Sequence, residues 1–291
     1  MILLFAYSTA FSQSQTQTQT DEAPPDTEIF LIPFHENEIK IDQIRNITNR
    51  KGYDNQPFFF PDGGKLFYTS IRDSEQADIY LYDLATQKTT RITQTEESEY
   101  SPTVMPGGNS FSTVRVEKDG TQRLWKFPIA GGEPVLIFTE IKPVGYHTWL
   151  NSNAAALFIL GEPPTLQMAD IATGKAKVIA SNIGRGMSKI PGKQTLSFVL
   201  KESETNWTVQ EWDPASGRMT PVATTLRDCE DIGWTPDGVL LMASGSKLFR
   251  LSAQNKEWLQ IADLESAGLS RITRIAVSPN GDWIAVVSEQ R

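Results

Sequence analysis

The chain has 291 residues, of which 39% are hydrophobic and 10% aromatic, and a formal net charge of −8 from 35 acidic and 27 basic residues. Because the basic residues form no cluster, the composition argues against nucleic-acid binding, which needs grouped Lys and Arg, and the negative charge argues against docking on anionic lipid. Cys229 is the only cysteine, so no internal disulfide can form, and we expect a buried small apolar side chain there.

The first residues predict export. Residues 1–12 begin with an apolar run, and Ala10-Phe11-Ser12 has small residues where signal peptidase cleaves, which would leave Gln13 as the new amino terminus. The run is too short for a membrane anchor. No Lys or Arg precedes it, so either the true start codon lies upstream or the run is not a signal, and we favour a clipped signal peptide. We therefore expect a bacterial protein that is periplasmic or secreted and has no stable membrane anchor.

Residues 13–26 are polar and of low complexity, with two prolines. Such a segment cannot bury enough apolar surface to fold, so we expect a flexible tether.

From residue 27 onward, one kind of turn recurs about every 45 residues. Its clearest copy is Pro61-Asp62-Gly63-Gly64, in which Pro sets the first corner and Asp and Gly supply the rest of a tight turn. The later copies are 106–109, 151–153, 191–193, 236–238 and 279–281. Apolar runs of four to six residues, rich in aromatic and β-branched side chains, flank these turns and predict strands.

Each repeat contains four such runs. In the first repeat they are 57–60, 66–70, 78–84 and 89–93, and later repeats have third or fourth runs at 123–127, 166–170, 177–180, 207–212 and 247–251. Four short antiparallel strands in a period of ~45 residues are typical of a propeller blade, so six turns predict six blades.

The two ends of the chain are predicted to share one blade. The last repeat has only two strands, 274–278 and 283–287, whereas residues 28–34 align with 78–84 and residues 45–48 align with 90–93. Pairing the two ends removes open sheet edges. We therefore expect an all-β fold over residues 27–291, a six-bladed β-propeller closed by pairing of N-terminal and C-terminal strands in one shared blade.

The motifs of common enzymes are missing from the sequence. There is no Gly-x-Ser-x-Gly elbow, no metal-binding His or Cys pattern, and only two histidines, of which His35 is expected in a solvated turn. We assign no catalytic residue, no metal ligand and no cofactor. One alternative stays open, a calcium-type site of carboxylate and amide oxygens built from Asn55, Asn151, Glu230 and Asp231.

The candidate site is the mouth of the central channel. In a propeller the innermost strands start at one rim, and residues five and six before each turn fall there. With His147, which replaces a blade-entry proline, the predicted binding residues are Asn55, Gln56, Tyr100, Tyr146, His147, Arg185, Glu230, Asp231 and Arg274. Tyr and Arg commonly anchor protein interfaces, and convergent polar groups are typical of ligand sites. The alternative is that these residues only solvate one face.

Residues Asn55–Ser70, followed by Ala77–Leu84 and Thr90–Thr93, resemble the WD-repeat-like propeller repeat of the TolB family. The resemblance covers roughly 26–291 and is weakest at 147–184. It implies a six-bladed propeller, and for TolB itself a periplasmic role in the Tol–Pal system, with the peptidoglycan-associated lipoprotein bound at the mouth. That protein has an α/β domain ahead of the propeller, where this chain has a polar tether. The resemblance therefore implies a propeller scaffold for this chain and not a role in the Tol–Pal system.

Three functions follow as hypotheses. The first is an exported, non-enzymatic scaffold, expected to be a monomer, that binds a protein or peptide partner of the cell envelope at the channel mouth. The second is a metal-dependent, lactonase-like hydrolase with a cation in the channel. The third is a sensing or gating propeller that works with a separately encoded peptidase, since similar repeats occur in prolyl oligopeptidase-type enzymes.

Overall fold

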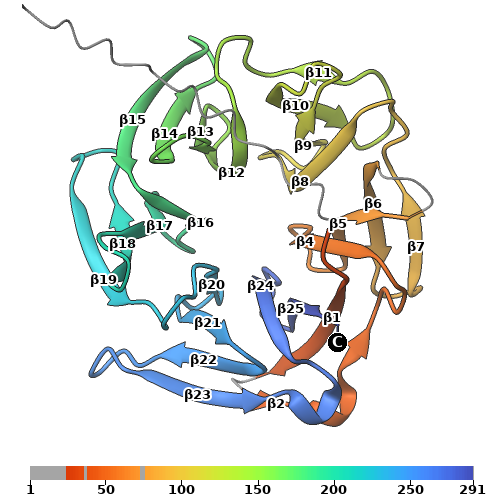
Figure 1. Cartoon of the computed structure of the whole chain (residues 1–291), viewed down its shortest axis with the longest axis vertical. Helices are drawn as coiled ribbons and strands as arrows, with labels where there is room; N and C mark the ends of the chain where they lie inside the picture. Colours follow the sequence, from red (N-terminus) through yellow and green to blue (C-terminus); the bar gives the residue numbers. More distant parts are fainter. Residues whose placement is uncertain (1–23, 36–37, 73–75, 291) are drawn as a thin grey trace, which may run out of the picture.

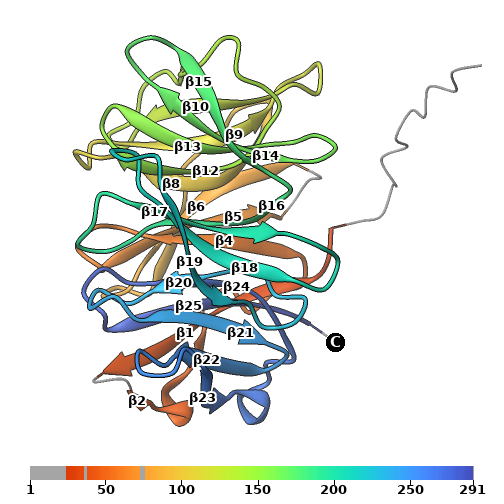
Figure 2. The ribbon, with the colours of Figure 1, turned by 90° about the vertical axis from the view of Figure 1, so that its left-hand side faces the viewer.

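The computed structural model describes residues 24–35, 38–72 and 76–290. The predicted signal peptide and all of the tether except residues 24–26 lie outside these residues. The described part is all-β apart from two short 3-10 turns, η1 (Ile41–Gln43) and η2 (Glu265–Ala267). Its sheets form a closed ring around a central axis, which Figure 1 shows from above and Figure 2 from the side. No described helix is long and apolar enough to cross a membrane.

Four sheets of four antiparallel strands make up most of the ring. The second unit is β8 (Ser98–Val104), β9 (Ser110–Val116), β10 (Gln122–Pro128) and β11 (Val135–Leu136), and the third is β12 (Val144–Asn151), β13 (Ala154–Ile159), β14 (Thr165–Asp170) and β15 (Lys175–Ser181). The fourth is β16 (Ile183–Lys189), β17 (Leu196–Lys201), β18 (Trp207–Trp212) and β19 (Met219–Thr224), and the fifth is β20 (Gly233–Trp234), β21 (Leu240–Ser244), β22 (Lys247–Leu251) and β23 (Trp258–Asp263).

The remaining strands form one nine-stranded sheet that consists of two such units. The first unit is β4 (Tyr53–Phe59), β5 (Lys65–Ile71), β6 (Ala77–Asp83) and β7 (Lys88–Arg91); the sixth is β24 (Arg271–Val277), β25 (Trp283–Glu289), β1 (Thr27–His35) and β3 (Arg45–Asn46), with β2 (Glu38–Ile39) beside β1. A single parallel residue pair, Thr27 with Tyr53, joins the two units. Divided at that pair, the described strands form the six four-stranded units that the repeat predicts.

The shared sixth unit confirms the predicted closure. β1 pairs with β25 from Thr27 opposite Glu289 to Pro33 opposite Trp283. β3 then pairs with the other edge of β1. It is shorter than the predicted run 45–48 because the Asn46 side chain accepts hydrogen bonds from the Thr48 and Asn49 backbone and turns the chain.

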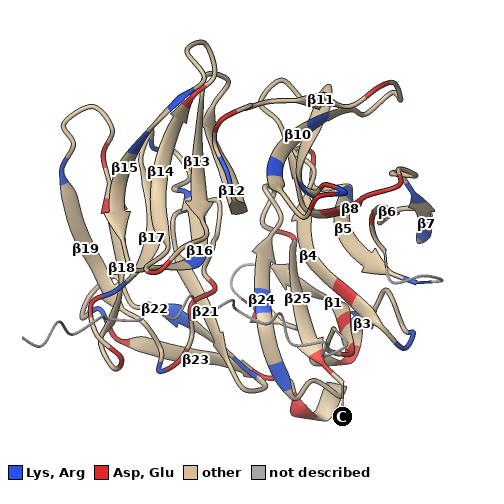
Figure 3. Ribbon diagram, turned by 45° about the horizontal axis from the view of Figure 1, so that its top comes forward, with Lys and Arg blue, Asp and Glu red and all other residues tan. Residues whose placement is uncertain are grey.

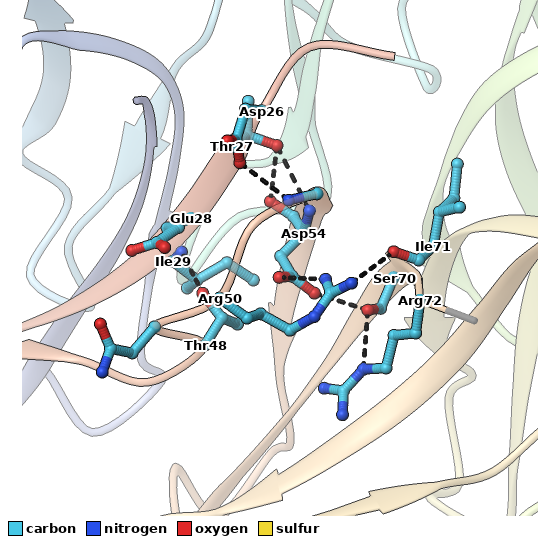
Figure 4. A network of polar contacts seen from close by, with 12 residues as sticks. Asp26, Thr27, Glu28, Ile29, Thr48, Arg50, Asp54, Ser70, Ile71 and Arg72 are labelled. Atoms are coloured by element: carbon cyan, nitrogen blue, oxygen red, sulfur yellow. Dashed lines mark hydrogen bonds and ion pairs between the residues drawn. The ribbon is translucent and has the colours of Figure 1, made fainter. Parts of the chain in front are cut away.

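Polar contacts reinforce the seam between the first and sixth units (Figure 4). The Thr27 hydroxyl donates to the Asp54 carbonyl at 3.0 Å, and the Asp26 carboxylate accepts from the Gly52 N–H at 2.8 Å. Both oxygens of the buried Asp54 carboxylate have donors, the Ser70 hydroxyl at 2.5 Å and Arg50 at 2.8 Å. We call Asp26, Thr27, Arg50, Asp54 and Ser70 the closure network.

Apolar side chains fill the space between neighbouring units. Phe67 of the first unit contacts Phe111 of the second, with ring centroids 4.7 Å apart, and Phe111 in turn stacks on Phe127 at 5.3 Å. Equivalent clusters lie between the other pairs of units. Consecutive apolar residues along a strand are therefore buried because both faces of each sheet are covered by neighbours.

Candidate functional site

The six inner strands deliver their first residues to one end of the central channel, here called the mouth. Five of these strands, β4, β8, β12, β16 and β24, have a register shift at this place. Such a bulge breaks the pairing to the second strand and re-aims side chains. In β4 and β8 the bulge is built by Gln56 and Ser101, which have positive φ of 57° and 53°. The predicted residues of these strands lie at or beside the bulges, except His147, which is paired with Leu157, while Glu230 and Asp231 precede β20.

An ion-pair cluster, here called the mouth cluster, links units four, five and six. It consists of Arg185, Lys201, Glu230, Asp231 and Arg274. Arg185 donates to Asp231 at 2.8 Å and lies 3.3 Å from Glu230, Lys201 lies 2.9 Å from Glu230, and Arg274 lies 3.4 Å from Asp231. Burial by itself would raise the pKa of Glu230, but Lys201 and Arg185 lower it below its usual value. Glu230 is therefore held ionised by its two cationic neighbours.

Arg274 reaches across the channel and joins four units. Besides Asp231, its guanidinium donates to the Tyr146 hydroxyl at 3.0 Å and to the Asn55 side-chain oxygen at 3.3 Å. It also lies 5.0 Å from the centroid of the Tyr146 ring, a cation–π contact. Burial would lower the pKa of Arg274, yet Asp231 and Tyr146 raise it above its usual value. Figure 3 shows β24, which carries this residue, beside the centre of the ring.

The channel holds a cavity of about 140 Å³ to which all six units contribute, and Arg185, Asp231 and Arg274 of the mouth cluster are part of its lining. The strands approach closely here: a side chain on Gly186 would overlap the carbonyl oxygen of Glu230. Pockets for small organic ligands usually measure about 300–1,000 Å³. This cavity is smaller than that range.

Two pockets flank the mouth. The tyrosine pocket, of about 430 Å³, is lined among others by Tyr53, Gln56, Tyr100, Tyr146 and Leu160 from units one to three. The arginine pocket, of about 310 Å³, lies between units five and six. It is lined by Arg185, Arg227, Asp228, Cys229, Glu230, Asp231, Arg271, Thr273 and Arg274, among others.

Tyr53 was missed by the sequence analysis. It precedes Asn55 by two residues in β4, so the period of two along a strand could have placed it on the same side. Burial raises the pKa of its hydroxyl above its usual value, with Arg274 opposing the shift, so the hydroxyl is neutral at physiological pH.

The structure places His147 below the mouth, inside the ring. Its side chain lines the channel cavity but is buried, and its Nε2 lies 2.6 Å from the Ser112 hydroxyl, which also accepts from Trp149 at 2.8 Å. The same Trp–Ser contact recurs between Trp234 and Ser197. Burial lowers the pKa of His147 to about 3. The ring is therefore neutral and belongs to an inter-blade contact.

The four residues weighed for a calcium-type site are not gathered into one place. Asn151 lies at the far end of β12, where its side chain accepts from the Asn153 backbone. Asn55 accepts from Arg274, and the acids Glu230 and Asp231 face cations. Within residues 24–35, 38–72 and 76–290 no group of three or more His, Cys, Asp or Glu side chains could hold a metal ion.

His35 and Cys229, the other two residues with a sequence-based expectation, lie in different parts of the ring. His35 is exposed and lies 3.3 Å from Asp282 at the turn end of the ring, away from the mouth. Cys229 is only partly buried and lines the arginine pocket; burial raises its pKa, which opposes formation of a reactive thiolate.

No protein-family model matches the chain, and no curated protein matches it in sequence. Among solved structures, a putative TolB from Agrobacterium tumefaciens is 13% identical with a TM-score of 0.72, covering 92% of this chain and 99% of that one. TolB from Acinetobacter baumannii is 17% identical with a TM-score of 0.61, over 92% of this chain and 66% of that one. A chain of a nidogen/laminin complex is 12% identical with a TM-score of 0.65, over 87% and 99%. This protein therefore has a TolB-like β-propeller fold.

Proposed function

We propose that this protein is an exported, non-enzymatic propeller scaffold that binds a protein or peptide partner of the cell envelope at the channel mouth. One observation carries the proposal: the inner strands gather polar and aromatic side chains around a small channel cavity, and two larger pockets lie beside it. A partner must then be recognised by the mouth surface.

The chemistry of the mouth supports binding rather than catalysis. Ser112 and His147 form the one Ser–His hydrogen bond among the described residues, but both are buried, and the other ring nitrogen of His147 has no described partner. A catalytic base needs a pKa near the working pH and an orienting group, and His147 has neither. Export is supported by the apolar run and small residues of positions 1–12.

The fold is compatible with this role without requiring it, because propellers carry many activities. One similar propeller comes from a complex between two proteins, nidogen and laminin. At 12% identity this likeness concerns the fold.

Affinity capture from bacterial envelope extract tests the proposal. The bait is the full chain, and the mouth variant carries Arg227→Ala and Arg271→Ala, whose side chains are 91% and 71% exposed at the arginine pocket. The matched control carries Lys88→Ala and Lys175→Ala, two exposed cations on the outer strands β7 and β15. We expect parent and control to retain the same proteins and the mouth variant to lose them. Equal retention by the mouth variant, or no specific retention by the parent, would overturn the proposal.

A further inference from the structure

Polar groups of the tyrosine pocket have free hydrogen-bond donors, because their acceptor oxygens already accept from neighbouring residues. Gln56 Oε1 accepts from the Ser101 N–H at 2.8 Å and from the Thr69 hydroxyl at 2.9 Å. A backbone N–H must donate to an oxygen, so the amide nitrogen of Gln56 is left as a donor, and no described residue accepts from it. Because Arg274 donates to the Tyr146 oxygen, the Tyr146 proton is likewise free to point away.

Tyr53 adds a third donor. Its neutral hydroxyl lines the same pocket and makes no hydrogen bond to another described residue. These three donors fit an oxygen-bearing group, and fit it best when the oxygens carry negative charge.

The charge beside the pocket has the matching sign. The mouth cluster contains three cations, Arg185, Lys201 and Arg274, against the two anions Glu230 and Asp231, so it carries one surplus positive charge. The whole chain has a net charge of −8, which makes the mouth a local exception. Arg274 brings this charge to the pocket wall through its contact with Tyr146.

Apolar groups line another part of the pocket, beside the polar Ser98 and Gln122. Val114, Val116 and the rings of Tyr53 and Tyr100 line the pocket, and Leu160 stands at it with 39% of its surface exposed. Gly145 keeps space open, because a Cβ there would come within 3.1 Å of Leu160 and Phe158 carbons. The volume of about 430 Å³ lies in the range of ligand-binding pockets.

We propose that the tyrosine pocket binds the free carboxyl terminus of a peptide or protein whose last residue is aromatic or aliphatic. Such a terminus carries a carboxylate and an apolar side chain on one carbon atom, which is the combination that the donors, the surplus charge and the apolar walls match. Capture of terminal carboxylates is an established mode of peptide recognition. This inference rests on the proposed function and specifies the partner's contact group.

The test measures fluorescence polarisation of four peptides titrated with the full chain. All carry an amino-terminal fluorescein on Gly-Ser-Gly-Ser and end in Phe or Ser, each as free acid and as carboxamide. We expect the Phe free acid to bind at least about tenfold more tightly than its amide, which lacks the charge, and than the Ser free acid, which lacks the apolar group. Equal binding of acid and amide, or no binding of the Phe acid, would overturn the inference.

Variants separate the two halves of the site. Tyr53→Phe removes only a hydroxyl and is expected to reduce the preference for acid over amide by about three- to tenfold. Leu160→Ala is expected to reduce the preference for Phe over Ser while leaving the acid preference intact. Val178→Ala, at an exposed apolar residue on β15 far from the mouth, is the control and should change neither ratio. Thermal unfolding of each variant confirms that the ring is intact.

Two further outcomes are informative. If the peptides do not bind but envelope proteins are captured and then lost by the Arg227→Ala/Arg271→Ala variant, the carboxyl-terminus inference is wrong while the proposed function holds. N-acetylphenylalanine is the probe for a small carboxylic acid. Tighter binding of this compound than of the Phe peptide would show that the site takes small acids, which also contradicts the inference.

Discussion

The closure network and the mouth cluster both pair arginine with aspartate, but they differ in how completely their polar groups are hydrogen-bonded. At the closure, both oxygens of Asp54 have donors, its side chain is fully buried, and burial raises its pKa in spite of Ser70 and Arg50. At the mouth, two arginines share Asp231. Three neighbouring donors, on Gln56, Tyr53 and Tyr146, have no acceptor among the described residues. A saturated, buried network stabilises the ring, whereas an unsaturated, half-open cluster offers groups to a ligand.

The strongest test of the closure is removal of residues 279–291, which deletes β25. Because β25 pairs with both β1 and β24, its loss opens the ring and exposes two strand edges. We expect loss of the cooperative thermal transition by circular dichroism, together with aggregation on size exclusion. A truncated chain that remained a folded monomer would contradict a role for the shared unit in stability.

Asp54→Ala is expected to destabilise the protein by about 3–5 kcal/mol in urea titrations, since it leaves Arg50 largely buried without its anion. The matched change at the mouth, Asp231→Ala, is expected to cost about 1–2 kcal/mol. Arg185 would retain its ion pair with Glu230, and Arg274 would retain its hydrogen bond to Tyr146. Similar losses at the two sites would remove the distinction between a structural and a binding network.

Because His147 is buried and neutral, we expect the stability of the fold to depend on pH. The pKa of His147 is about 3 in the fold and 6.5 in the unfolded chain, so the unfolded state binds the proton first as pH falls. The contribution of the neutral His147 side chain to the free energy of unfolding is therefore complete above pH 6.5 and is lost as pH decreases toward 3. Between pH 7 and 4.5 the loss from this group is about 2–3 kcal/mol.

The measurement compares urea unfolding of the parent and His147→Gln at pH 7 and 4.5, so that other titrating groups cancel. The difference in unfolding free energy between the two proteins should shrink at the lower pH. An unchanged difference would mean that the imidazole is solvated.

The smallest expected effect compares two tyrosines. Tyr68 is fully buried and its hydroxyl accepts from Arg72 at 2.8 Å, so Tyr68→Phe should cost about 1–3 kcal/mol. Tyr53→Phe removes a hydroxyl without a described partner and should stay within about 0.5 kcal/mol. Thermal unfolding distinguishes the two. A large loss for Tyr53→Phe would mean that its hydroxyl serves the fold rather than a ligand.

Much of the ring could be predicted from residues alone. The Pro-Asp-Gly-Gly turn at 61–64 and its copies imply hairpins because few residues adopt the positive φ that such turns need, as Gly63 does with φ of 71°. The alignment of residues 28–34 with 78–84 implied that β1 completes the last unit, and the pairing of β1 with β25 confirms it. These signals are local or periodic, so they survive without knowledge of distant contacts.

The mouth was predicted as a list of positions but not as an arrangement. Spacing placed Arg185, Asp231 and Arg274 at equivalent points of their repeats, yet nothing local indicates that the two arginines share one carboxylate or that Arg274 reaches Tyr146, 128 residues away. The assignment of these residues as a binding site remains a prediction.

The amino-acid sequence by itself determined the repeat, the strands and the pairing of the chain ends, because turn chemistry and hydrophobic period act over a few residues. Only the tertiary structure decided which polar groups at the mouth neutralise one another and which stay available. That outcome depends on six inner strands meeting around one axis, where the bulges, burial and charges of different repeats act on each other across a few ångströms.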